Sequence, residues 1–238
     1  MRRVFLLLML FAGILLYAQA PASWGTKAGM NLSQHYGTKG DEGDFEVKTG
    51  LRPGFVGGAN LDFAASEILS LGFEALYSMK GSYQTITIRY LEIHGVVEEL
   101  EKPAKMRVKY FLDYFELPVL LKLKIMDKPA WDMSVITGSA MSLKLKGYHD
   151  LDGTVFFPDG NGGFDPIRIR ENSDLSSVNM FDYSLIYGGA LRLKSRIPIS
   201  LEYRFTLGWD YLSLPTYQLF DPVQLRNQTW SLMLSSTF

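Results

Sequence analysis

Apolar and polar residues alternate along most of this chain in runs of strand length, and turn-forming residues separate the runs. Successive side chains of a strand point to opposite faces, so each run predicts a strand with one apolar face. Eight such runs lie at about residues 23–34, 50–63, 67–80, 106–126, 131–146, 180–194, 198–211 and 226–238. The alternation therefore predicts an all-β protein.

The connections between these runs alternate between short and long. Tight turns follow the second, fourth and sixth runs, with the sequences AASE, DKPA and SRIP. Segments rich in Gly, Asp, Asn and Pro follow the other runs, and we expect the clearest of them, GYHDLDGTVFFPDGNGGFDPIRIRENSD, to be a turn-rich loop. This order places all short turns at one end of an up-and-down sheet and all long loops at the other.

The two faces of the runs differ in size as well as in polarity. Leu201, Tyr203 and Phe205 share one face, while Glu202 and Arg204 share the other with small residues. Lipid outside and a packed polar lumen inside explain this division, because eight strands leave an interior that side chains just fill. We therefore expect an eight-stranded antiparallel up-and-down transmembrane β-barrel with short periplasmic turns and long extracellular loops. The alternative is a secreted, lipocalin-like soluble barrel.

The N-terminus and the composition fit export to the outer membrane. Two arginines precede an apolar run at 4–16, which predicts a signal peptide at residues 1–20, cleaved near residues 18–22, before a barrel domain at 23–238. A membrane anchor helix is the alternative. The 24 Lys and Arg balance 25 Asp and Glu, so nucleic acid is not an expected partner. Cysteine is absent, which excludes disulfides and thiolate sites.

Charged residues on the polar face predict a charge network in the lumen. Its members are Arg52, Glu74, Glu116, Lys122, Lys124, Arg192, Glu202 and Arg204. We expect Glu202 to face Arg192 across the 195–198 turn, and Lys122 to be the nearest basic residue to Glu74. Opposite charges buried together neutralise one another and hold the barrel shut. The alternative is a narrow ion path through the lumen.

Candidate catalytic and metal-binding residues occur in the predicted loops. His35, His94 and His149 are expected to be surface loop residues; a rim hydrolase would need a Ser or Asp within hydrogen-bond reach of His149. The stretch 150–163 offers oxygen ligands for calcium, but its spacing differs from that of the twelve-residue calcium loop. We therefore predict no catalytic residue, no metal site and no cofactor.

The most unusual connection lies at residues 81–106. TITIRYLEI alternates and is β-branched, and AKMRVKYF can pair with it, so the third and fourth runs are predicted to continue beyond the membrane as a protruding hairpin. An exposed strand edge can bind a protein partner by strand addition. The alternative is a solvated loop without a partner.

The C-terminal residues and three internal segments carry a resemblance to a known family. The chain ends TWSLMLSSTF, with Trp230, Leu232, Leu234 and Phe238 on one face, which resembles the signal that the barrel-assembly machinery recognises. KAGMNLS (27–33), GFEALYSMKG (72–81) and YFELPVLLKLK (114–124) resemble the PorT-like outer-membrane β-barrel family of the Bacteroidota. The resemblance implies an eight-stranded barrel in contact with outer-membrane lipid. PorT itself resembles an accessory protein of a protein-secretion system.

These observations favour an outer-membrane barrel without enzymatic activity. Its long loops would serve binding, adhesion or protein secretion. Transport through a narrow lumen and hydrolysis at the outer rim are the alternatives.

Overall fold

The computed structural model describes residues 22–37, 45–93, 96–158, 164–176, 178–210, 212 and 225–238, and these residues form ten strands. The predicted signal peptide at 1–20 lies outside the described residues. The described part of the chain contains no helix long and apolar enough to cross a membrane. The strands are β1 (Ala22–Gly37), β2 (Phe45–Gly50), β3 (Arg52–Ala64), β4 (Leu69–Ile93), β5 (Val96–Asp127), β6 (Trp131–Pro158), β7 (Phe164–Asp174), β8 (Phe181–Leu193), β9 (Ile199–Gly208) and β10 (Leu225–Thr237).

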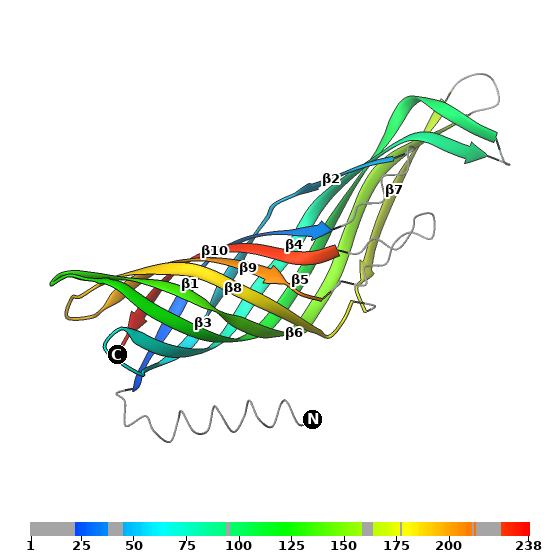
Figure 1. Ribbon diagram of the computed structural model, residues 1–238. Coiled ribbons are helices and arrows are strands. Elements are labelled where there is room, and N and C mark those ends of the chain that lie inside the picture. Colours follow the sequence, from blue (N-terminus) through cyan, green and yellow to red (C-terminus); the bar gives the residue numbers. More distant parts are fainter. Residues whose placement is uncertain are drawn as a thin grey trace.

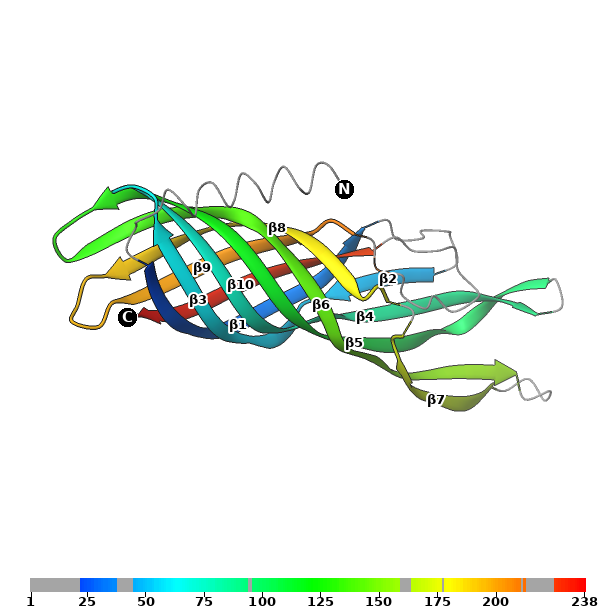
Figure 2. The ribbon, with the colours of Figure 1, turned by 90° about the horizontal axis from the view of Figure 1, so that it is seen from below.

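Eight of these strands close into a ring, as Figures 1 and 2 show. Neighbours in the ring are antiparallel and follow the order β1, β3, β4, β5, β6, β8, β9, β10. The first and last strands complete the ring through a ladder from Gly25↔Thr237 to Gly37↔Leu225. The predicted eight-stranded up-and-down barrel is therefore confirmed, and the three tight turns lie together at the end that holds the C-terminus.

The two faces of the ring have the predicted polarity. On β10, Leu232 and Leu234 point outward and are 53% and 58% exposed, whereas Ser231 and Ser235 point inward and are buried. Large apolar side chains on the outside of a barrel are stable in lipid and unfavourable in water. A soluble barrel with an apolar interior does not fit this arrangement.

The ladders of β4, β5 and β6 continue well beyond the ring (Figure 1). β4 and β5 stay paired up to Ile93↔Val96, which confirms the predicted hairpin at 81–106. β2 pairs with β4, and β7 pairs with β6, so the outer sheet has the order β2, β4, β5, β6, β7. We call this sheet the extension: β2, β7, residues 83–93 of β4, 96–110 of β5 and 147–158 of β6.

The extension corrects one prediction from the sequence. The segment from Gly147 was expected to be a turn-rich loop, but its residues 147–158 belong to β6 and residues 164–174 form β7. Gly and Asp disfavour strands in isolation, yet pairing with an existing edge satisfies their backbone groups. Residues 159–163, the end of the stretch that was considered as an alternative calcium site, lie outside the described residues.

An apolar cluster fills the ring where the extension begins. Tyr110, Leu112 and Tyr114 of β5 point inward there, and Leu175 and Val178 cover them from the segment after β7. All five side chains are at most 6% exposed. The extension therefore rises from a closed end of the barrel.

Candidate functional site

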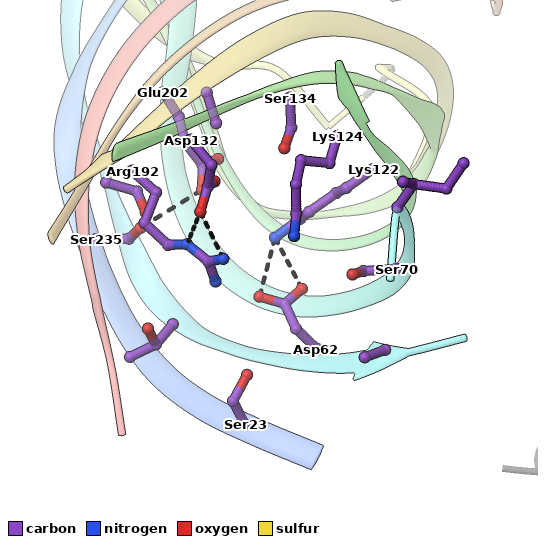
Figure 3. A pocket seen from close by; sticks show the side chains of 15 residues that line it. Ser23, Asp62, Ser70, Lys122, Lys124, Asp132, Ser134, Arg192, Glu202 and Ser235 are labelled. Carbon is purple, nitrogen blue, oxygen red and sulfur yellow. Dashed lines mark hydrogen bonds and ion pairs between the residues drawn. The ribbon is translucent and has the colours of Figure 1, made fainter. Parts of the chain in front are cut away.

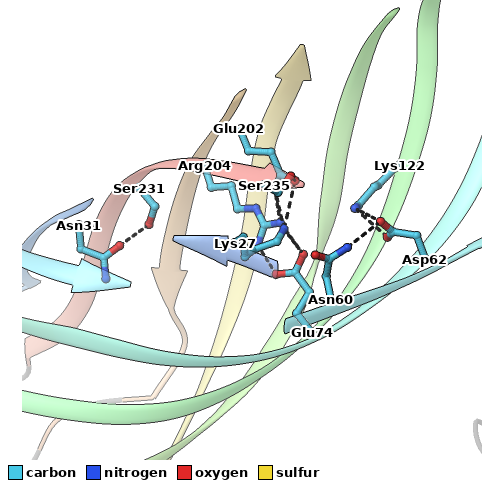
Figure 4. A network of polar contacts seen from close by, with 10 residues as sticks. All are labelled: Lys27, Asn31, Asn60, Asp62, Glu74, Lys122, Glu202, Arg204, Ser231 and Ser235. Carbon is cyan, nitrogen blue, oxygen red and sulfur yellow. Dashed lines mark hydrogen bonds and ion pairs between the residues drawn. The ribbon is translucent and has the colours of Figure 1, made fainter. Parts of the chain in front are cut away.

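Four charged side chains form the centre of the lumen (Figure 4). Lys27 of β1 donates to Glu74 of β4 at 2.6 Å and to both carboxylate oxygens of Glu202 at 3.1 Å. Arg204 of β9 donates to Glu74 at 2.6 and 2.7 Å and to Glu202 at 2.5 Å. We call these residues the quartet; it contains two positive and two negative charges, and each member is at most 5% exposed.

Small residues on the neighbouring strands give the quartet its space. Lys27 stands opposite Gly58, and Arg204 stands opposite Gly188. A Cβ atom at Gly58 would lie 2.0 Å from the carbonyl oxygen of Ala75, so glycine is required by this close backbone approach. The small residues of the polar face therefore leave the space into which the long charged side chains of the opposite strands extend.

A polar cavity of about 140 Å³ lies between the quartet and the short turns (Figure 3). Two ion pairs cross it: Lys122 with Asp62 at 2.7 Å, and Arg192 with Asp132 at 2.7 Å. Other lining residues carry hydroxyl groups, namely Ser23, Ser70, Ser134, Ser200, Ser235 and Thr237, or are apolar, namely Ala64, Ile68 and Ala190. The cavity near the short turns is thus charged but electrically balanced, with Lys122, Lys124 and Arg192 against Asp62, Asp132 and Glu202.

Two predicted pairings are wrong. Arg192 faces Ser200, while Glu202 faces Ala190, so Arg192 binds Asp132 on β6 instead of Glu202. Lys122 likewise binds Asp62 and not Glu74. Arg192 binds a carboxylate on the neighbouring strand β6, because the register of β8 and β9 differs from the one predicted. Lys122 of β5 instead reaches past β4 to Asp62 of β3.

The other predicted lumen charges occupy separate positions. Glu116 pairs with Lys80, a residue that the sequence reading omitted although it shares the inward face of β4 with Glu74. Lys124 binds Asp127 at 3.0 Å near the turn after β5. Arg52 donates to the backbone carbonyl of Lys80, and its guanidinium lies 4.4 Å from the centre of the Phe111 ring.

Two of the three histidines are buried inside the barrel, which corrects their assignment to surface loops. His35 and His149 are 1% and 6% exposed, and Tyr110 lies between their rings at centroid distances of 5.5 and 6.1 Å. Ser82 Oγ lies 2.8 Å from His35 Nδ1, but Ser82 is fully buried. His94 lies outside the described residues.

The Asp residues that follow His149 do not join it in the arrangement that a rim hydrolase would need. His149 points inward, whereas the alternation of β6 turns Asp150 and Asp152 outward. Among the described residues, no group of His, Asp and Glu side chains could hold a metal ion.

The C-terminal residues lie on the outer face of β10. Leu232, Leu234 and Phe238 are exposed, and Trp230 is half-buried against Phe205 at a centroid distance of 5.5 Å. The Phe238 ring packs on Trp24 at 5.1 Å, and its backbone nitrogen donates to the Trp24 carbonyl. The predicted assembly signal thus forms a continuous surface with the start of β1; its role in assembly stays a prediction.

Comparisons with known proteins bear on the family. The sequence model described as "Outer membrane protein beta-barrel domain" matches residues 17–209. A comparison with curated protein sequences finds no match.

Three solved structures are similar in fold. The attachment invasion locus protein Ail of Yersinia pestis has 14% identity and a TM-score of 0.34, with 91% of this chain and 99% of that chain covered. Neisserial surface protein A has 10% identity and a TM-score of 0.39, with 92% and 99% covered. The outer membrane protease OmpT from Escherichia coli has 10% identity and a TM-score of 0.44, with 93% and 98% covered.

Proposed function

We propose that this chain, which belongs to the outer membrane protein beta-barrel domain family and is located in the outer membrane, is a non-enzymatic anchor for its extension. The extension would bind an extended segment of a protein partner. The continuation of the β4–β5 ladder from the ring to Ile93↔Val96 carries this proposal, because the paired hairpin extends its outer edges beyond the ring.

The distal part of the hairpin has the backbone geometry that strand addition needs. β2 pairs with β4 up to Ile88, and β6 pairs with β5 from Lys105. Beyond Ile88↔Ala104 the ladder shifts register, and within the described chain the pairs from Tyr90↔Glu99 to Ile93↔Val96 have no third strand beside them. Their outward-facing N–H and C=O groups can therefore accept a further strand.

The closed lumen supports binding over transport. A conducting path would have to pass the quartet, whose ion pairs join β1, β4 and β9 across the interior. Apolar clusters also fill the interior, including Leu120, Ile136 and Ile186. Eight strands normally enclose a filled interior, whereas aqueous channels are wider.

The histidine geometry supports the absence of catalysis. A rim hydrolase would need an accessible nucleophile beside His149, but this ring is packed on Tyr110 inside the barrel. The Ser82–His35 pair has hydrogen-bond distance but no exposed surface through which a substrate could reach it. We therefore propose a binding role without a chemical step.

We also propose, from the PorT-like resemblance of residues 27–33, 72–81 and 114–124, that the partner belongs to a protein-secretion system. An adhesion partner outside the cell is the alternative. The two differ in whether the partner is made by the same cell, which a crosslinking experiment resolves.

The test removes the distal hairpin while leaving the ring intact. Ile88 and Ala104 face each other in the ladder, so residues 89–103 can be replaced by Asn-Gly, a two-residue hairpin turn. Crosslinking in intact cells should recover a reproducible partner with the wild type and lose it with the shortened chain. Both proteins should show the same folded mobility on unheated gels. Retention of the partner by the folded, shortened protein would refute the assignment to the hairpin.

A further inference from the structure

One edge of the extension has no partner strand within the described part of the chain. β7 pairs with β6 along one side, and Figure 2 shows it at the margin of the extension. The other side of β7, which we call the free edge, lies away from β6. An unpaired strand edge presents a row of backbone N–H and C=O groups and is a template for a further strand.

A backbone hydrogen bond at the end of β7 shows which residues face the free edge. The nitrogen of Leu175 donates to the carbonyl oxygen of Gly147 at 3.0 Å, and this pair continues the β6–β7 register by one position. Bonded and non-bonded pairs alternate along an antiparallel ladder. The odd-numbered residues of β7 are therefore bonded to β6. The N–H and C=O groups of Arg168, Arg170 and Asn172 point to the free edge.

The side chains beside the free edge form two rows of different chemistry. Arg168 and Arg170 are exposed on the outward face of β7. On the opposite face, Ile167 is 50% exposed and Ile169 is half-buried against the apolar cluster. Pro166 precedes these residues and has no N–H group, so the usable edge begins after it. An added strand would meet cations on one face and isoleucines on the other, in alternation.

The charge on the outward face favours an acidic ligand. Asp152 of β6 accepts hydrogen bonds from Arg168 at 2.9 and 3.1 Å and lies 3.7 Å from Arg170. Asp150 is the other carboxylate in the rows that the ladders define across β5, β6 and β7. The same rows contain three exposed cations of β5, and they are Lys105, Arg107 and Lys109. Cations therefore exceed carboxylates beside the free edge.

We propose that the free edge of β7 binds an extended segment of a protein partner in which acidic and apolar residues alternate. The backbone of residues 168–172 would pair with the segment, its acidic side chains would contact the two arginines, and its apolar side chains would cover the two isoleucines. Cations alone attract any polyanion, but a sugar chain or a nucleic acid would leave the backbone edge and the isoleucines unused. The free edge is separate from the hairpin at residues 89–103, so this site goes beyond the proposed function.

The test measures the binding of a synthetic peptide to the purified full chain in phosphatidylcholine nanodiscs. The probe is a fluorescent peptide of about nine residues in which Glu and Val alternate, and anisotropy gives its affinity. One control peptide has Lys in place of Glu, and another has the same Glu and Val residues grouped in two blocks. We expect both control peptides to bind about ten-fold more weakly, because they lose the favourable cross-strand pairs on one or both faces.

Variants of the chain place the peptide on the free edge. Asn172→Pro removes an N–H group from that edge without changing the charge, whereas Asn172→Ala keeps the group. We expect about five-fold weaker binding for the proline variant only, as for the loss of one backbone hydrogen bond. Arg170→Gln should weaken binding by about three-fold and keeps the proposal testable if the proline variant folds poorly. Lys128→Gln removes an exposed cation at the short turns and should bind the peptide as the wild type does.

The outcomes that would overturn the proposal are distinct from those that test the hairpin. Equal binding of the block peptide would show a general anion surface, and unchanged binding by Asn172→Pro would exclude pairing with the free edge. The chain that lacks residues 89–103 should bind the alternating peptide normally; loss of binding there would move the site to the hairpin. Asn172→Pro should keep the partner that crosslinks to the hairpin in cells, so the failure of one proposal leaves the other standing.

Discussion

Removing one charge from the quartet should strongly destabilise the barrel. Glu74 accepts hydrogen bonds from Lys27 at 2.6 Å and from Arg204 at 2.6 and 2.7 Å, and it is 5% exposed. Glu74→Gln keeps the shape of the side chain but leaves two buried cations with a single carboxylate, Glu202. Breaking a buried ion pair from one side costs about 3–5 kcal/mol, and a pair of charges about 4 Å apart interacts by about 4 kcal/mol in a partly polarisable interior.

The compensating variant separates charge balance from shape. Lys27→Met combined with Glu74→Gln restores neutrality, because the Arg204–Glu202 pair remains at 2.5 Å. We expect the double variant to recover most of the loss, since buried ion pairs can be replaced by apolar groups at little net cost. Lys194→Gln, which breaks the exposed pair with Asp127, should change the free energy of unfolding by less than about 1 kcal/mol.

The assay is reversible denaturant unfolding in phospholipid vesicles, followed by the fluorescence of the four tryptophans. Changes in the midpoint at constant slope give the difference in unfolding free energy. A loss below about 1 kcal/mol for Glu74→Gln would refute the argument that the quartet is held by its charge balance. A double variant no more stable than the single one would refute it as well.

Three other experiments test separate parts of the structure. Gly58→Ala should greatly reduce the fraction of molecules that fold, because the added Cβ would lie 2.0 Å from a backbone carbonyl oxygen. Gly50→Ala should fold normally, because its nearest neighbouring atom is 3.7 Å away. Folded mobility on unheated gels checks both variants. Phe238→Ala should slow insertion in cells more than Trp24→Ala if the terminal residue is a recognition signal, whereas equal effects would indicate that only their 5.1 Å ring contact matters. Hydrogen bonds from Arg168 hold the pKa of Asp152 below its usual range. The stability that Asp152 contributes is therefore present above the unfolded pKa and is lost as the pH falls through the lower folded pKa. Hydrogen exchange of β7 should rise only under strongly acidic conditions, and Asp152→Asn should abolish that pH dependence.

The ring of strands was predictable because each strand carries its own signal. Alternation in runs such as 198–211 reports a local property, namely which side chains face lipid and which face the lumen. The apolar residues that interrupt the polar face, Leu76 and Ile186, are also explained, because they pack inside with other inward apolar groups. Strand number and orientation follow from these local signals and from the turns.

The charge partners were not predictable in the same way. Glu74 and Arg204 are 130 residues apart, and Lys27 reaches Glu74 although β3 separates their strands. Such contacts depend on the stagger of all eight strands around the ring. The predicted Glu202–Arg192 pair failed because the ladder pairs Leu193 with Ile199, which centres the turn one position earlier than assumed. A slip of one position in a turn changes every pairing along the hairpin.

The structure separates the charges of this protein into two sets with different consequences. Inside the ring, each cation of the quartet has a carboxylate within 3.1 Å, because an unbalanced charge in a closed interior is costly. On the outward face of the extension, the cations Lys105, Arg107, Lys109, Arg168 and Arg170 accompany only Asp150 and Asp152, because exposed charges are stabilised by water. Charge balance inside is therefore a requirement of folding, whereas exposed charges outside need no such balance.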